Sequence, residues 1–237
     1  MSTGLPIVYE DPWLALVEKP AGLASEAGAA EESVLKWFGE YLAKKYPGQK
    51  QLSAGLPHRL DKPVSGLLLL TKRRQPLKIL GDHSREHWKK YYLAVLAGDY
   101  TGPGQLVHYI EKQAGSLKAL AHTRPVPGAK KAELRCHVLA RSDDTTTVFI
   151  ELLTGRYHQI RVQFAAAGFP ILGDTLYNGG PAVPPAAIAL HACKLVFTHP
   201  VEQKQMTFHS DYVAVTGFPE HPALSEAMQI LSKSVYF

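Results

Sequence analysis

The sequence lacks the features that mark membrane, exported and metal-binding proteins. Its apolar runs, such as Gly66–Leu70, stop far short of the roughly 20 residues that a membrane-spanning helix needs. Its two cysteines, Cys136 and Cys193, lie far apart and show no spacing typical of metal ligands. The first ten residues carry no basic flank followed by an apolar stretch, the pattern of an export signal. These absences predict a cytoplasmic protein with reduced thiols and no metal.

The sequence also has no internal repeat and no low-complexity linker. Of its 237 residues, 46% are hydrophobic and 20% are charged, a composition typical of globular proteins. A chain of this length is long enough to bury a sizeable core. This length fits one large domain or two small ones. Because no stretch resembles a linker between domains, we expect one domain over residues 1–237.

The spacing of the apolar residues predicts an α+β fold with a mixed, largely antiparallel central sheet, flanked by helices and loops. Several expected strands follow one another without an intervening helix, which favours antiparallel pairing. Three- and four-residue spacing predicts helices at 31–46, 75–85 and 158–167. Runs of β-favouring residues predict strands at 65–71, 91–97, 133–139, 146–153, 194–198 and 205–209.

The formal net charge of +5 is concentrated in one segment. Residues 72–90 contain seven basic and two acidic side chains, a difference of +5, and the rest of the chain is balanced. Such a segment suits contact with phosphate groups, although a solvated surface fits the charge equally well. Arg73, Arg74 and Lys89 are the candidates for contact with a polyanion.

An aspartate in a polar turn stands out in the segment from His58 to Gly66, His-Arg-Leu-Asp-Lys-Pro-Val-Ser-Gly. Asp61 precedes a run apolar enough to form a buried strand, and such a turn presents a side chain at the rim of a sheet. Read alone, Asp61 fits a turn or capping residue better than a catalytic one.

A second segment, from Leu153 to Arg161, combines the end of a strand, a glycine and the start of a helix. It reads Leu-Thr-Gly-Arg-Tyr-His-Gln-Ile-Arg, and the helix carries Arg161 in its first turns. In isolation this arginine fits a solvated helix surface better than a cleft.

Together, five short segments resemble the RluA-type family of pseudouridine synthases. They occur in order as Lys-Pro-Ala-Gly at 19–22, His-Arg-Leu-Asp at 58–61, Lys-Tyr-Tyr-Leu-Ala at 90–94, Thr-Gly-Arg-x-His-Gln-Ile-Arg at 154–161, and Gly-Asp-x-x-Tyr at 173–177. The resemblance extends from about Ile7 to Pro200. It implies a pseudouridine synthase catalytic domain that isomerises uridine in ribosomal or transfer RNA, without a metal or an organic cofactor.

The resemblance also implies roles for individual residues. Asp61 matches the nucleophilic aspartate of the family, and Tyr92 matches the tyrosine that packs on the target base. Arg161 matches the basic residue that pairs with the aspartate, and Ile160 matches its apolar neighbour in the pocket. Arg59 matches an arginine that fills the space left by the flipped nucleotide in some members.

The chemistry is consistent with these roles. The enzyme must take uridine out of its stack, which costs a few kcal/mol, before the bond from C1′ to N1 can be exchanged for one to C5. Asp61 then attacks the sugar or removes a proton from it, and the sequence leaves both routes open. A guanidinium beside Asp61 would keep the carboxylate ionised against the effect of burial.

The sequence departs from the family pattern at three places. Val64 and Tyr157 stand where threonine is common, and Ala-Ser-Glu at 24–26 replaces the usual apolar residue and histidine. None of these changes removes a proposed catalytic group, but each bears on the choice of substrate. We also expect no N-terminal S4 domain, so RNA affinity would come from the catalytic domain itself. The protein is expected to be a monomer.

Three other functions compete with this interpretation. A metal-dependent hydrolase would need ligand spacing that the eleven histidines lack, so His58 is expected to contact RNA or to be structural. A glycosidase would need a second carboxylate near Asp61, where the motif supplies an arginine instead. A catalytically silent RNA-binding protein would bind RNA without turnover.

Overall fold

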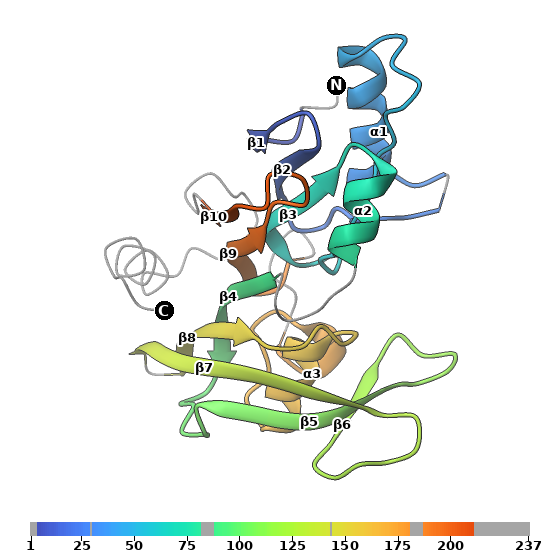
Figure 1. Ribbon diagram of the computed structural model, residues 1–237. Coiled ribbons are helices and arrows are strands. Elements are labelled where there is room, and N and C mark those ends of the chain that lie inside the picture. Colours follow the sequence, from blue (N-terminus) through green and yellow to red (C-terminus); the bar gives the residue numbers. More distant parts are fainter. Residues whose placement is uncertain (1–3, 29, 82–87, 143, 181–186, 211–237) are drawn as a thin grey trace. The chain divides into compact units, whose positions relative to one another are not determined.

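The computed structural model describes residues 4–28, 30–81, 88–142, 144–180 and 187–210 (Figure 1). They form two compact units. The described part of unit 1 is 4–88 and 192–210, and that of unit 2 is 89–191, with the gaps just given. The chain passes between the units inside β4 (Trp88–Ala97) and again inside β9 (Leu190–Thr198).

Unit 1 is built on strands that neighbour one another in the order β1–β2–β3–β9–β10. The pairs β1–β2, β2–β3 and β9–β10 are antiparallel. The remaining elements of unit 1 are β1 (Ile7–Glu10), β2 (Leu14–Lys19), β3 (Ser65–Thr71), β10 (Gln205–His209), α1 (Val34–Lys45) and α2 (Arg74–Gly81).

The core of unit 1 lies around β2 and β3, whose residues are all buried. Leucines of both strands pack with Trp88 and Phe197. Strand β9 passes so close to Gly66 that a Cβ atom there would lie 2.4 Å from the backbone oxygen of Ala192. With a φ of 115°, this position also has a backbone conformation that favours glycine. The strand that follows Asp61 is therefore fixed against β9 from its second residue.

Helix α1 begins at a conventional N-cap. The Ser33 side chain accepts a hydrogen bond from the backbone N–H of Lys36 at 3.2 Å. The buried residues Val34, Phe38 and Leu42 recur every four positions, so one face of the helix packs inward.

Unit 2 contains an antiparallel sheet in the order β4–β8–β7–β5–β6. In Figure 1 the long strand β7 lies between β8 and β5. The other elements of unit 2 are β5 (Gln105–Lys112), β6 (Ala119–His122), β7 (Lys130–Ser142), β8 (Thr145–Leu152), α3 (Gln159–Ala166) and the 3-10 turn η1 (Thr175–Tyr177).

Helix α3 is bounded by two residues with positive φ. His158 precedes it at a φ of 51°, and Gly168 follows it at 88°. The glycine ends the helix as its position predicts. All residues from Gln159 to Phe164 are buried, so the helix is enclosed on more than one face.

The predicted α+β fold with largely antiparallel strands is confirmed. The strands predicted at 65–71 and 205–209 have those bounds, and the other predicted strands lie within or overlap β4, β7, β8 and β9. The helices predicted at 31–46 and 158–167 are shorter in the structure. The one predicted at 75–85 is α2, and its last four residues lie outside the described part of the chain. Strands β1, β2, β5 and β6 were not predicted.

Among the described residues, no helix combines the length and the apolar character needed to cross a bilayer.

Candidate active site

Asp61 lies in a tight turn immediately before β3. Its backbone oxygen accepts a hydrogen bond from the N–H of Val64 at 3.0 Å, and the strand begins at Ser65. The Asp61 side chain is half-buried. The predicted turn at the head of a buried strand is therefore confirmed.

The buried ammonium group of Lys19 holds this turn through hydrogen bonds to backbone oxygens. It donates hydrogen bonds to the backbone oxygens of Leu23 at 2.7 Å, Pro20 at 3.0 Å and Lys62 at 3.3 Å. Burial lowers the pKa of Lys19 to about 7, against the opposing attraction of the Asp61 carboxylate. The Lys-Pro-Ala-Gly segment at 19–22 thus holds the loop that carries Asp61.

The turn is also fixed from the side by Ser25. This buried hydroxyl donates to the backbone oxygen of Leu60 at 2.7 Å, and it accepts from the N–H of the same residue at 3.1 Å. Next to it, Glu26 forms a 3.4 Å ion pair with Arg59, and both side chains are more than half exposed. Two of the three residues that depart from the family pattern at 24–26 therefore contact the segment that carries Asp61.

His58 is buried within unit 1 and has a structural contact. Its Nε2 accepts a hydrogen bond from the backbone N–H of Leu69 at 3.0 Å, and its ring meets Trp88 edge-on at 5.1 Å. These contacts fasten the loop to β3. A contact of His58 with RNA stays a prediction.

In unit 2, Arg161 is held by a buried carboxylate. Its Nε and Nη2 donate to the two oxygens of Asp174 at 2.7 and 2.8 Å, and the two side chains are 6% and 1% exposed. Such a bidentate pair fixes the plane of the guanidinium. The guanidinium also lies over the ring of Tyr177, 5.3 Å from its centre.

The hydroxyl of Tyr177 joins three parts of unit 2. It accepts a hydrogen bond from the N–H of Ala119 in β6 at 2.8 Å, and it lies 3.1 Å from Nδ1 of His158. The ring of Tyr177 thus packs against the guanidinium of Arg161, and its hydroxyl is hydrogen-bonded to β6.

Gln159 organises the segment that leads into α3. Its side-chain oxygen accepts from Thr154 Oγ1 at 2.8 Å and from the N–H of Arg156 at 3.0 Å. Its side-chain nitrogen donates to the backbone oxygen of Glu133 at 3.1 Å. The glutamine of the second motif is therefore a structural residue that sets the start of the helix.

The other predicted site residues are distributed over both units. Tyr92 in β4 and Ile160 in α3 belong to unit 2 and are buried. Lys89 is an exposed residue of unit 2, whereas Arg73 and Arg74 belong to unit 1 at the start of α2. Arg73 is half-buried and Arg74 is exposed.

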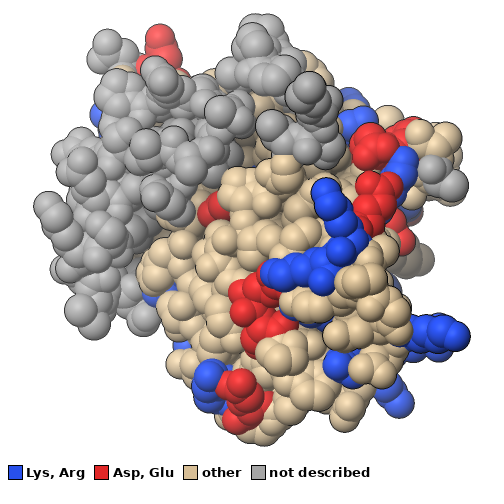
Figure 2. All heavy atoms as spheres, turned by 90° about the horizontal axis from the view of Figure 1, so that it is seen from above, with Lys and Arg blue, Asp and Glu red and all other residues tan. Residues whose placement is uncertain are grey.

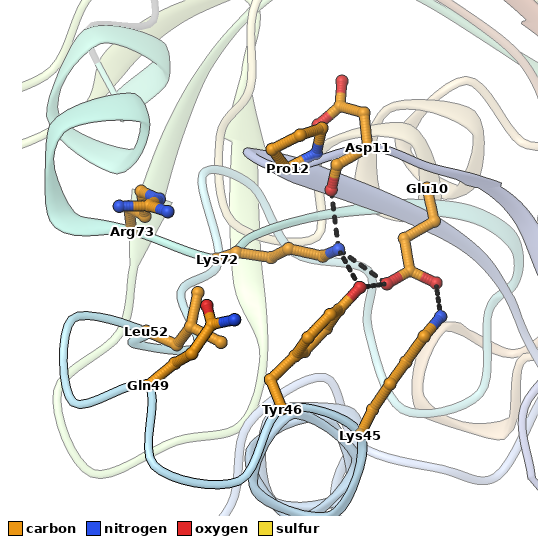
Figure 3. Close-up of a pocket in the computed structure, with 9 residues that line it drawn as sticks. All are labelled: Glu10, Asp11, Pro12, Lys45, Tyr46, Gln49, Leu52, Lys72 and Arg73. Carbon is orange, nitrogen blue, oxygen red and sulfur yellow. Dashed lines mark hydrogen bonds and ion pairs between the residues drawn. The ribbon is translucent and has the colours of Figure 1, made fainter.

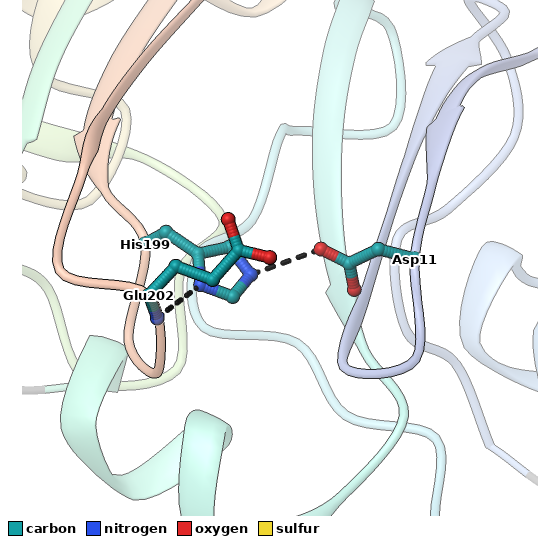
Figure 4. A group of neighbouring side chains, drawn as sticks. All are labelled: Asp11, His199 and Glu202. Atoms are coloured by element: carbon teal, nitrogen blue, oxygen red, sulfur yellow. Dashed lines mark hydrogen bonds and ion pairs between the residues drawn. The ribbon is translucent and has the colours of Figure 1, made fainter.

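One group of three metal-type side chains occurs among the described residues, namely Asp11, His199 and Glu202 (Figure 4). Both ring nitrogens of His199 are already engaged. Nε2 lies 2.9 Å from the Asp11 carboxylate, and Nδ1 accepts from the N–H of Glu202 at 2.9 Å. Burial raises the pKa of Asp11, but hydrogen bonds from its neighbours outweigh this and lower it. The group is built as a hydrogen-bond network that ties β9 to the β1–β2 turn.

The sequence matches the family model described as RNA pseudouridylate synthase over residues 14–166. The chain belongs to this family.

The sequence is also similar to curated proteins that are named as pseudouridine synthases. The chain is 36% identical over 208 residues to an uncharacterized RNA pseudouridine synthase of Bacillus subtilis (strain 168), covering 87% of this chain and 72% of the relative. It is 30% identical over 213 residues to the ribosomal large subunit pseudouridine synthase C of Vibrio cholerae, covering 86% of this chain. The chain spans 64% of the length of that relative.

Two human structures share the fold. The human RNA pseudouridylate synthase domain containing 4 has a TM-score of 0.69 and 22% identity, covering 87% of this chain and 88% of its own. The human RNA pseudouridylate synthase domain containing 1 has a TM-score of 0.68 and 21% identity, covering 97% and 95%. At this identity the likeness concerns the fold.

The sequence motifs did not reveal the residues that support the candidate site. Asp174 and Tyr177 stood in a quoted motif, yet nothing in the motif showed that they hold Arg161. Lys19 stood in another, and nothing in that motif showed that its ammonium group holds the turn at Asp61. Ser25 was read only as a departure from the family pattern.

We expect the replacement Ser25→Ala to weaken both stability and catalysis. Loss of the hydroxyl leaves the backbone groups of Leu60 without their partner, which costs about 1–3 kcal/mol in urea unfolding. Because the change displaces the turn and not a substrate contact, kcat should fall while KM stays near that of the wild type. Ser116→Ala, which removes an exposed hydroxyl of unit 2, is the control. Equal kcat values for wild type and Ser25→Ala would contradict this role.

Proposed function

We propose that this protein isomerises uridine to pseudouridine in ribosomal RNA, with Asp61 as the nucleophile. The observation that carries the proposal is the placement of Asp61. In a chain of the pseudouridylate synthase family, it stands on a turn that Lys19 and Ser25 fix at the head of a buried strand.

The proposed reaction is a rearrangement within one nucleotide. The bond from C1′ to N1 breaks, the detached base turns, and a bond from C1′ to C5 forms. The C5 proton is released to solvent, and N1 takes up a proton, so the atoms balance without a co-reactant. Asp61 assists at the sugar, by attack on it or by removing a proton from it.

Two residues of unit 2 complete the proposed catalytic set. Tyr92 offers an aromatic face to the base and a hydroxyl near C5 without adding a competing charge. Arg161 serves as the cation that pairs with Asp61 and orients it, as the resemblance implies. Its own orientation is fixed by Asp174, which supports this role. The pairing of Arg161 with Asp61 stays a prediction.

Several residues are proposed to bind the RNA. Ile160 would line the pocket for the base. Arg59, whose side chain is 70% exposed, would leave its ion pair with Glu26 to enter the space left by a flipped nucleotide. His58, Arg73, Arg74 and Lys89 complete the proposed RNA-binding set.

Large-subunit ribosomal RNA is the proposed substrate because relatives with that printed function match most of this chain. Transfer RNA is the alternative substrate. A catalytically silent RNA-binding protein is the alternative function, and it differs in one measurable respect: it binds RNA without turnover.

A tritium-release assay tests the proposed activity. Uridine labelled with tritium at C5 is incorporated into transcripts of large-subunit ribosomal RNA and of transfer RNA, and each is incubated with the protein. Release to solvent should occur from ribosomal RNA and approach one equivalent per modified site. Binding of both transcripts without release from either would support the silent RNA-binding protein instead.

A further inference from the structure

A pocket of about 410 Å³ opens in unit 1, outside the loop that carries Asp61 (Figure 3). It lies where the end of α1, the turn between β1 and β2, and the start of α2 meet. Its lining is Glu10, Asp11, Pro12, Lys45, Tyr46, Gln49, Leu52, Lys72 and Arg73.

The carboxylate of Glu10 is fully engaged inside this pocket. Lys72 donates to its Oε1 at 2.6 Å, and Lys45 donates to its Oε2 at 2.7 Å. Two tyrosine hydroxyls, those of Tyr41 and Tyr46, add hydrogen bonds at 2.6 and 2.9 Å. Burial alone would raise the pKa of Glu10, but these hydrogen bonds lower it to about 2. One negative charge thus meets two ammonium groups, and one positive charge is left over.

Among the described residues, Arg73 is a pocket cation with no ion-pair partner. Its guanidinium lies over the ring of Trp13, 5.0 Å from the ring centre, and its buried Nε has no hydrogen-bond partner among the described residues. A buried donor without a partner is costly, and in native proteins it commonly marks the place of a bound ion or water. Figure 3 shows Arg73 apart from the network around Glu10, without a dashed line.

The other acidic residue of the lining does not offset Arg73. The Asp11 carboxylate accepts hydrogen bonds from the N–H groups of Trp13 and Leu14 at 2.6 and 2.7 Å, and it also contacts His199. In Figure 3 it points away from Lys72, which instead donates a hydrogen bond to the backbone oxygen of Asp11 at 2.6 Å. The donors left for a ligand include the guanidinium of Arg73, the exposed amide of Gln49 and one N–H of Lys45, whose other two bind Glu10 and Tyr41.

The wider surface does not supply an extended basic area in the view of Figure 2. Among the side chains drawn there in blue and red, basic and acidic groups lie next to one another. On the face drawn there, an anion would meet local groups of donors and not a broad positive field.

We propose that this pocket binds a phosphate group of the RNA substrate. The inference rests on the proposed function, since it assigns the pocket to the same RNA. Arg73 donates to the phosphate oxygens from its stacked position on Trp13, and Gln49 adds a neutral donor. Lys45 and Lys72 supply positive charge while they remain bound to Glu10. A guanidinium is suited to this because its planar set of donors matches two phosphate oxygens.

The first measurement uses inorganic phosphate and NMR of arginine side chains labelled with ¹⁵N. The Nε–H signal of Arg73 is assigned by its loss in Arg73→Lys. Titration with phosphate at constant ionic strength should shift this signal along a saturable curve, whereas chloride should not. A signal that does not move with phosphate, or moves equally with chloride, would overturn the phosphate site.

The second measurement connects the pocket to RNA. Arg73→Gln should weaken binding of the ribosomal transcript on the order of 10-fold and lower the dependence of log K on log salt by about 0.7–1. Lys44→Gln removes an equal charge from an exposed residue of α1 that does not line the pocket, and it should change binding several-fold less. Equal losses in both variants would show diffuse attraction and would contradict the pocket. Retained phosphate binding with unchanged RNA affinity would show a site for free phosphate and would equally contradict the proposal.

The tritium assay separates this inference from the proposed function. Arg73→Gln should raise the KM for the ribosomal transcript in step with its loss of RNA affinity, whereas Lys44→Gln, outside the pocket, should release tritium as the wild type does. Wild-type affinity in Arg73→Gln together with normal release would remove the pocket and leave the activity standing. RNA binding that depends on Arg73, in a protein that releases no tritium, would support the phosphate pocket and refute the proposed activity.

Discussion

Asp61→Asn should abolish tritium release from uridine in ribosomal RNA while the protein still binds the transcript. An amide is isosteric with the carboxylate, but it cannot attack the sugar or take a proton from it. Loss of a catalytic nucleophile lowers kcat by a factor of about 10³ or more. The turn itself should survive, because it is closed by the backbone oxygen of Asp61 and not by its side chain.

Two controls make the Asp61 result specific. RNA affinity, measured at one fixed salt concentration, should stay within a few-fold of the wild type, which excludes unfolding as the cause. Lys62→Gln, a change at the exposed neighbour of Asp61, should retain turnover, since only the backbone of Lys62 contacts Lys19. Undiminished release by Asp61→Asn would refute the assignment of the nucleophile.

Asp174→Ala should destabilise the protein more than any other single change considered above. It leaves the guanidinium of Arg161 buried at 6% exposure without its bidentate partner. Removing one member of a buried ion pair costs about 3–5 kcal/mol. The free energy of unfolding should fall by this amount in urea titrations, and turnover should fall as well because Arg161 is no longer held in one orientation.

A second aspartate–arginine pair of unit 2 provides the matched control. Asp99 accepts a hydrogen bond from Arg141 at 2.8 Å, but the two side chains are 62% and 53% exposed. Asp99→Ala should therefore cost no more than about 1 kcal/mol. The double variant Asp174→Leu with Arg161→Met should recover much of the lost stability, since apolar replacement of a buried pair is often neutral. Similar losses for Asp174→Ala and Asp99→Ala would contradict the buried-pair account.

The elements that the sequence predicted are those with a local signal. Strand β3 is a continuous apolar run, and α1 has apolar residues at helical spacing. Strand β2 was missed because it ends in Glu18 and Lys19, residue types that predict exposure, yet both are buried. Strand β5 alternates between buried and exposed positions, but its sequence does not alternate in the same way, because His108 is buried and Val107 is exposed.

The candidate site divides in the same way. The turn at Asp61 could be predicted because prolines, a polar stretch and an apolar strand follow one another along the chain. The partners of Arg161 could not, because Asp174 and Tyr177 belong to a segment beyond the end of α3. Arg73 was predicted as part of a charged stretch. Its stacking on Trp13 depends on tertiary structure, which linear charge counting does not contain.

The hydroxyl of Tyr177 has a consequence for motion within unit 2. It is bonded to the first residue of β6, Ala119, while the ring below it carries the guanidinium of Arg161. Any ligand that pulls β6 outward must break the bond to Ala119 or tilt the ring with the strand. If the ring tilts, a displacement of the β5–β6 hairpin also moves the guanidinium of Arg161, because that group packs on the ring of Tyr177.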